Sequence, residues 1–178
     1  MLDVAINYEC QVRERLRSVW FKEKYKYWNA TSYYQDWSLA DGTWTEHQFV
    51  SVRDGIVIGY ISYCIDRADG DVVHSLNIIN FEERPSGTFA LDCGHAIRNI
   101  FEKYRFRKLN FFVIVGNPIE KTYDKMIDRY GGRIVGIKKK NARLIDGKYY
   151  DEKLYEIMRD DYMEAVNEEK RTRDRSQR

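Results

Sequence analysis

The segment VVHSLNIINFEERPSGTFALDCGHAIRNIFEKY, residues 72–104, carries the strongest structural signal in this chain. Its opening residues, 72–81, are largely apolar and typical of a buried strand. Charges, a proline and Gly87 follow, and from residue 88 apolar side chains recur at helical spacing. The first turn of a helix has backbone N–H groups without intrahelical partners. This segment therefore predicts a strand-to-helix turn that can hold a phosphate group. The alternative is a turn without a ligand, in which proline and glycine only end the strand and begin the helix.

Three strands are predicted around the start of this segment. Residues 47–81 hold apolar runs separated by two Asp-Gly turns, at 54–55 and 69–70. Asp-Gly pairs are typical of hairpins, so we expect an antiparallel meander. Before it, residues 7–28 have apolar side chains at helical spacing, which predicts a helix.

The chain after residue 104 continues with alternating elements. KLNFFVIVG, residues 108–116, is typical of a strand buried on both faces. NPIEKTYDKMIDRYGG predicts a helix with Asn117 as the N-cap and Pro118 in the first turn. Two or three strands with another Asp-Gly turn follow, and a short last helix comes after residue 159. This order predicts an α/β fold around a mixed central sheet flanked by helices.

The chain length fits a single domain. We assign residues 1–165 to that domain and residues 166–178 to a charged tail, which we expect to be frayed and solvated. No apolar run approaches the length of a membrane span, and the N-terminus lacks the pattern of a signal peptide. We therefore expect a cytoplasmic protein that does not bind membranes.

Cysteines and charge exclude some classes of site. Cys10, Cys64 and Cys93 are widely spaced, which argues against a disulfide framework and against a zinc site, so no metal is expected. The net charge is +2, which does not favour a nucleic-acid partner. The run KKKNAR and the tail leave nucleic-acid or ribosome binding as one alternative, whereas a solvated hairpin is the simpler interpretation of KKK.

The order of elements, the segment 72–132 and the ending GKYYDEKLYEIMR resemble the GNAT family of acetyl-CoA-dependent N-acetyltransferases. The resemblance covers roughly residues 5–160. It implies a single-domain acyl-CoA N-acyltransferase fold. It also implies a transferase that uses acetyl-CoA as cosubstrate and acetylates a primary amine of a small molecule or a peptide.

The family's phosphate loop has the form Q/R-x-x-G-x-G/A between a strand and a helix, and RPSGTF at 84–89 matches its first two conserved positions. The resemblance implies that this loop binds the pyrophosphate through Arg84, Ser86, Gly87, Thr88 and Phe89. The family has a small residue where this chain has Phe89. We expect either that the large ring points away from the loop or that the pyrophosphate sits differently.

The resemblance also implies positions for the rest of the cosubstrate. The pantetheine arm would pair with the end of the strand at Ile79, Asn80 and Phe81, and an N–H near Phe81 would stabilise the oxyanion. Asn117 and Tyr123 match a family asparagine and a tyrosine near the sulfur, although the family tyrosine often lies one residue further on. The alternatives are an N-cap for Asn117 and core packing for Tyr123.

The chemistry implied is direct transfer in a ternary complex, without a covalent enzyme intermediate. Tyr123 is then the candidate acid for the departing thiolate. Glu82, next to the cofactor segment, is the candidate base, while Glu83, His74 and His47 are weaker choices.

The acceptor side is predicted to lie in residues 28–47, which are rich in aromatic side chains. These rings together with Asp36 and Glu46 would suit a cationic amine with an apolar body. A catalytically weak GNAT-like module that binds CoA or a protein partner is the alternative function. The oligomeric state is open, with a homodimer as one option.

Overall fold

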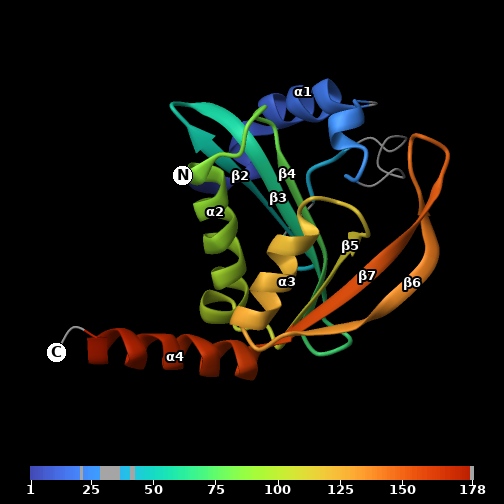
Figure 1. Ribbon diagram of the computed structural model, residues 1–178. Coiled ribbons are helices and arrows are strands. Elements are labelled where there is room, and N and C mark those ends of the chain that lie inside the picture. The colour runs from blue at the N-terminus through green and yellow to red at the C-terminus, as the bar shows by residue number, and fades with distance from the viewer. Residues whose placement is uncertain (21, 29–36, 41–42, 177–178) are drawn as a thin grey trace.

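A central sheet organises the computed structural model, which describes residues 1–20, 22–28, 37–40 and 43–176 (Figure 1). In these residues seven strands follow the order β1-β2-β3-β4-β5-β7-β6, and only β4 and β5 run parallel. The strands are β1 (Leu2–Val4), β2 (Glu46–Arg53), β3 (Ile56–Asp66), β4 (Val72–Asn80), β5 (Lys108–Ile114), β6 (Arg133–Arg143) and β7 (Tyr149–Met158). The helices are α1 (Glu9–Val19), α2 (Gly87–Arg98), α3 (Glu120–Arg129) and α4 (Arg159–Ser176), with short turns η1 (Ala5–Tyr8), η2 (Glu23–Tyr25) and the π-helical η4 (Asn99–Lys103).

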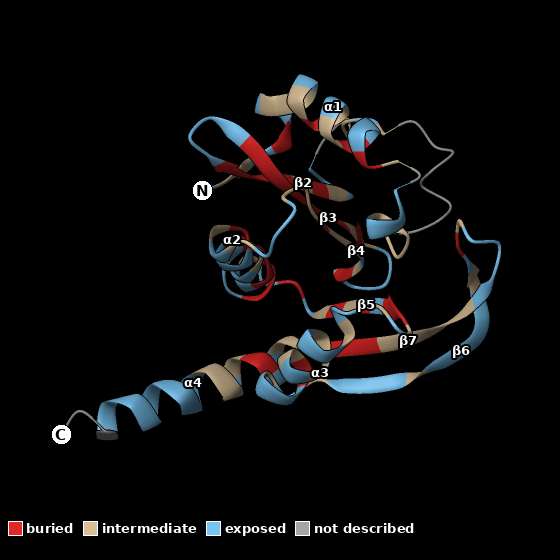
Figure 2. Cartoon of the chain, turned by 45° about the horizontal axis from the view of Figure 1, so that its top comes forward, coloured by how far each residue is buried: buried red, intermediate tan, exposed pale blue. Residues whose placement is uncertain are grey.

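Two hydrophobic clusters cover the two faces of the sheet. On one face α2, η4 and α3 bury side chains such as Ile97, Phe101 and Ile127 against the strands. On the other face α1 buries Val12 and Leu16 with its neighbours, and Figure 2 shows buried residues in red on the central strands that the helices cover. The α/β architecture predicted from the sequence is therefore confirmed.

The parallel strands β4 and β5 separate almost as soon as they meet. They pair only at Val72 with Lys108 and at Val73 with Leu109. The register of β4 against β3 shifts directly afterwards, around Ser75, whose φ is +53°. A bulge of this kind bends a strand and ends its pairing on one side. Beyond it β4 is held by β3 alone and β5 by β7, so a gap opens between them.

Several element boundaries differ from those predicted. The first helix ends at Val19 rather than at residue 28, because Trp20 leaves the helical region with ψ of 138°. The segment after residue 166, predicted to be frayed, is helical through Ser176. Its helix is anchored near its start by Tyr162, which stacks on Phe101 with ring centroids 4.5 Å apart. Farther along, Glu169 pairs with Arg129 of α3.

The hairpin of β6 and β7 forms the exposed edge of the sheet. The lysine run at 138–140 lies on β6, where the side chains face solvent and Lys139 pairs with Asp151 at 2.9 Å. Within the described residues, no helix combines the length and the hydropathy needed to cross a bilayer.

Candidate active site

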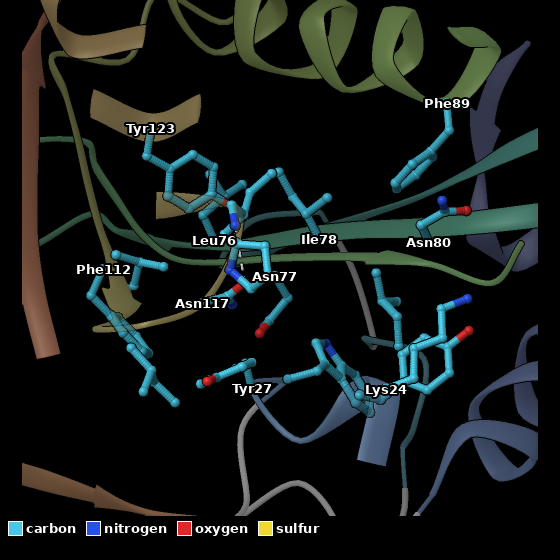
Figure 3. Close-up of a pocket in the computed structure, with 17 residues that line it drawn as sticks. Lys24, Tyr27, Leu76, Asn77, Ile78, Asn80, Phe89, Phe112, Asn117 and Tyr123 are labelled. Atoms are coloured by element: carbon cyan, nitrogen blue, oxygen red, sulfur yellow. Dashed lines mark hydrogen bonds between the residues drawn. The ribbon is translucent and has the colours of Figure 1, made fainter. Parts of the chain in front are cut away.

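A cavity of about 410 Å³ occupies the gap between β4 and β5 (Figure 3). Asn80 of β4 and Phe89 of α2 lie at one end, and Asn117 and Tyr123 lie toward the other. Lys24 and Tyr27 reach it from the α1 side of the sheet. The cavity therefore brings together five of the residues predicted from the sequence: Ile79, Asn80, Phe89, Asn117 and Tyr123.

The backbone of β4 offers hydrogen-bonding groups to this gap. The N–H of Phe81 donates to the carbonyl of Ile58 at 3.0 Å, so this residue faces β3. In an antiparallel pair the facing direction alternates along the strand, and the backbone of Ile79 therefore also faces β3. The backbones of Leu76, Ile78 and Asn80 face the gap. The N–H of Phe81 itself is bonded within the sheet, so an N–H near Phe81 for the oxyanion would have to come from a neighbouring residue that faces the gap.

The predicted phosphate loop leads into the first turn of α2. Ser86 is the N-cap, and its hydroxyl oxygen accepts from the N–H of Phe89 at 3.4 Å. Among the described residues no hydrogen bond engages the N–H of Gly87 or of Thr88. A Cβ added at Gly87 would meet no atom within 4 Å, so packing does not require glycine there. The open space and the two N–H groups fit an oxyanion group that approaches the helix closely.

Asn80 fixes the shape of this loop from inside. Its side-chain Nδ2 donates to the carbonyl of Arg84 at 3.1 Å, and its Oδ1 accepts from the N–H of Glu82 at 3.0 Å. These bonds turn the loop and leave the side chain of Arg84 exposed at its outer edge. An exposed guanidinium beside a helix N-terminus can approach a phosphate without losing an ion pair.

Phe89 is accommodated by a glycine on the neighbouring strand. Its ring is buried against Gly59 of β3, where any added Cβ would collide with the ring. The ring therefore points to the sheet and forms a wall of the cavity, near Asn80 (Figure 3). Of the two expected arrangements, the ring adopts the one that points away from the loop.

Tyr123 lies on α3 with its ring edge-on to Phe111, at 5.2 Å between centroids. Burial, with the nearby Cys93 and Tyr155 as smaller causes, raises the pKa of Tyr123 well above its usual value of 10.0. The hydroxyl is therefore protonated at neutral pH and has a proton to donate. Among the described residues it makes no hydrogen bond that would hold that proton elsewhere.

Asn117 precedes α3 as a turn residue rather than as its N-cap. Its Oδ1 accepts from the N–H of Ile119 at 3.1 Å, while the helix begins only at Glu120. Because Pro118 and Ile119 form an intervening turn, the asparagine is held at the cavity wall with its Nδ2 uncommitted among the described residues. It can act both as a structural residue and as a donor to a ligand.

Glu82 lies outside the cavity. Its carboxylate pairs with Arg53 at the end of β2, and a hydrogen bond from Ser86, followed by the Arg53 charge, lowers the pKa of Glu82. A paired carboxylate with a lowered pKa is a weak proton acceptor. The geometry therefore does not support the predicted role of Glu82 as the base.

The histidines are no better placed than Glu82. His74 lines neither the large cavity nor the smaller one beside it, and its Nδ1 is 2.9 Å from the hydroxyl of Ser75. The two nitrogens of His47 are bonded to Tyr63 and to the carbonyl of Thr43, and burial lowers its pKa. Within the described ranges, no group of three or more His, Cys, Asp or Glu side chains could hold a metal ion.

A second cavity of about 150 Å³ adjoins the first on the α1 side of the sheet. Trp28 and Asn77 line both cavities, and the place where these two side chains border both of them is called the junction. Gln48, Ser62 and Asn77 form a polar row across β2, β3 and β4, since each is in register with the next. The remaining wall contains Glu46, Tyr60 and the rings of Trp20 and Trp37.

The sequence predicted Glu46 and the aromatic rings for the acceptor side but not the polar row. Polar residues on separate strands form no recognisable pattern in the sequence, because only the register of the sheet places them side by side. Asp36, the other predicted carboxylate, lies outside the described residues. The indole Nε1–H of Trp28 is buried and has no hydrogen-bond partner among the described residues, which is unusual for a buried donor.

Solved structures with a similar fold are acetyltransferases. Spermidine/spermine N-acetyltransferase SpeG from Vibrio cholerae, in complex with manganese ions, matches with a TM-score of 0.57 at 21% identity, over 68% of this chain and 70% of that chain. A chimera of SpeG with hSSAT gives 0.57 at 22% identity, over 68% and 74%. A T. thermophilus protein, whose name gives the acetyltransferase class but no substrate, gives 0.52 at 20% identity, over 67% and 62%.

No protein-family model and no curated protein sequence matches this chain. The comparison therefore rests on architecture, and at these identities it establishes the fold alone. The chain has the acetyltransferase fold of the GNAT type, which its sequence resembles.

Proposed function

We propose that this protein is an acetyl-CoA-dependent N-acetyltransferase that moves an acetyl group onto a primary amine of an acceptor. The observation that carries the proposal is the junction of two cavities at Asn77 and Trp28. The larger cavity suits a thioester arm and the smaller one an amine, so two bound reactants would meet where the cavities join. The amine acetyltransferases among the similar structures support this assignment.

The cosubstrate would be held mainly by backbone groups. The N–H groups of Gly87 and Thr88 and the side chain of Arg84 would bind the pyrophosphate. The gap-facing backbone of Ile78 and Asn80 would pair with the amide groups of the pantetheine arm, as an added strand pairs with a sheet edge. Asn117 is a further donor at the far end of the cavity.

The bound thioester supplies an activated acyl group. In the transfer the amine nitrogen forms a bond to the carbonyl carbon while the carbon–sulfur bond breaks. The amine loses a proton to water, and the departing thiolate takes a proton from the hydroxyl of Tyr123, which regains a proton from water. The gap-facing N–H of Ile78 would donate to the carbonyl oxygen as negative charge develops there.

Direct transfer in a ternary complex is favoured over an acyl-cysteine route. Burial raises the pKa of Cys93 to about 12 and also raises that of Cys64. Neither thiol lines either cavity. A protonated thiol outside the cavities is a poor nucleophile. Initial rates should therefore depend on both substrates in the pattern of a sequential mechanism.

A reducing compartment suits this chain. Cys10, Cys64 and Cys93 are free thiols, and thiols of this kind persist in the cytoplasm, which we infer as the location. The homodimer suggested as an option by the sequence stays a prediction.

The test combines ligand binding with turnover. Acetyl-CoA and CoA should raise the melting temperature, unlike unrelated nucleotides, because a ligand that binds only the native state stabilises it. Incubation of acetyl-CoA with a panel of primary amines should give acetylated products, read by mass spectrometry because the exposed Cys10 would disturb thiol assays. Stabilisation by CoA without any acetylated amine would instead support the alternative, a CoA-binding module without catalysis.

A further inference from the structure

The smaller cavity has its carboxylate at the end away from the junction. Asn77, at the junction, is in register with Ser62 on β3, which is in register with Gln48 on β2. Two strand spacings, about 10 Å in total, therefore separate the junction from β2. Glu46 lies two residues from Gln48 on the same face of β2, and its Oε1 accepts from the Gln48 side-chain Nε2 at 3.0 Å. Its carboxylate is thus held beside Gln48 rather than at the junction.

This carboxylate lacks a cationic partner. Among the described residues Glu46 makes no ion pair, although it is partly buried. Arg13, which lies over the ring of Trp37, is itself paired with Glu9 at 2.8 Å. A partly buried charge without a partner is unfavourable, and a ligand cation would relieve that cost.

The walls between the two ends suit an apolar linker. The rings of Trp20, Trp28 and Trp37 line this cavity together with the polar row. Trp37 is fixed in place, since its Nε1–H donates to the hydroxyl of Tyr60 at 3.0 Å. Aromatic rings bind both methylene groups and the faces of organic cations. A cavity of about 150 Å³ has the size that accommodates a benzene-sized group, so the linker must be slender.

We propose that Glu46 binds a second positive charge on the acceptor, remote from the nitrogen that is acetylated. The substrate class is then a diamine, with a neutral amine at the junction of the cavities and a charged group at Glu46. This inference rests on the proposed N-acetyltransferase function and makes Glu46 a specificity-determining residue for it. A carboxylate that acted as the base would have to lie at the reacting nitrogen instead.

The test compares α,ω-diamines of increasing chain length with monoamines of the same length. For the wild-type protein, kcat/KM should be at least about tenfold higher for the best diamine than for the matching monoamine. Glu46→Gln should lower kcat/KM for diamines by about tenfold and leave monoamines within about twofold. Glu14→Gln, which neutralises an exposed carboxylate on α1, is the matched control and should change neither series.

Equal losses for diamines and monoamines in Glu46→Gln would overturn the inference and assign Glu46 to proton transfer. Equal use of both series by the wild-type protein would also overturn it. Binding provides a readout that needs no turnover, because the indoles of the cavity report a bound ligand through tryptophan fluorescence. Weaker diamine binding by Glu46→Gln than by Glu14→Gln would support the charge interaction even where no amine is acetylated. The absence of acetylation would contradict the proposed function and leave the result on binding unchanged.

Discussion

The two cavities that meet at Asn77 and Trp28 differ in what they offer a ligand. Besides its side chains, the larger one borders the unpaired backbone edge of β4, and Phe89 brings it to the first turn of α2. The smaller one is lined by side chains, with a carboxylate, a polar row and indole rings. Backbone groups are the same in every sequence that adopts the fold, whereas side chains belong to this chain alone. The backbone groups of the fold therefore support the proposed cosubstrate, whereas the individual side chains support the proposed acceptor.

Tyr123 provides the largest expected effect in the larger cavity. Tyr123→Phe removes the proton donor without removing the ring, and kcat should fall by roughly 100-fold with little change in KM for acetyl-CoA. Since the pKa of Tyr123 is raised, the wild-type hydroxyl keeps its proton to pH values above 10.0, and any loss of rate at lower alkaline pH must have another cause. Measurements of kcat and KM for the wild-type protein and for Tyr123→Phe across a range of pH values check the loss of rate and the pH dependence.

Tyr155→Phe is the control for this change, because Tyr155 neighbours Tyr123 but its hydroxyl donates to Asp124 at 2.8 Å. It should lower stability slightly and leave kcat unchanged. An equal loss of kcat in both variants would mean that altered packing, rather than the loss of a proton donor, causes the fall.

Gly87 tests whether backbone at α2 binds the cosubstrate. Gly87→Val fills the open space above the first turn and should weaken CoA binding by roughly 30-fold in calorimetry, with little change in melting temperature. Gly94→Val, on the same helix and equally free of neighbours, should leave binding unchanged. Equal weakening by both variants would point to helix propensity and away from a phosphate site.

Trp28 tests the junction between the cavities. Trp28→Phe keeps an aromatic ring and removes a buried donor that has no partner in the described part of the chain, so the free energy of unfolding should rise by about 1 kcal/mol in urea titrations. A fall in stability would mean that the packing lost with the larger indole outweighs the cost of its buried donor. Trp37→Phe is a useful contrast, since it deletes an indole N–H that does have a partner, Tyr60.

Glu82 carries the smallest expected effect. Glu82→Gln should leave kcat within about twofold, because the carboxylate pairs with Arg53 outside both cavities. The lowered pKa of Glu82 means that its ion pair stabilises the native state above the unfolded pKa and that this contribution is lost as pH falls through the folded pKa. The variant should lack this acid-side loss. A large fall in kcat would restore Glu82 as the base.

Glu82 and Glu46 show what a single sequence can predict and what it cannot. Glu82 is near the cofactor segment along the chain, and that proximity favoured it as the base. Its side chain is nevertheless paired with Arg53, which lies 29 residues away in sequence. Glu46 is distant in sequence from Asn77, yet both line one cavity because β2, β3 and β4 are in register. Register depends on pairing between distant segments, and local pattern does not specify it.

The residues alone were sufficient to predict the meander, the strand-to-helix turn at Gly87 and the helix that carries Tyr123. Those features follow from turn chemistry and from periodicity within a few residues, which are local properties of a chain. The folded structure was needed to find the gap between β4 and β5, the burial of Phe89 against Gly59 and the polar row beside Glu46. Each of them requires that segments far apart in sequence meet in one register, and packing of the whole domain sets that register.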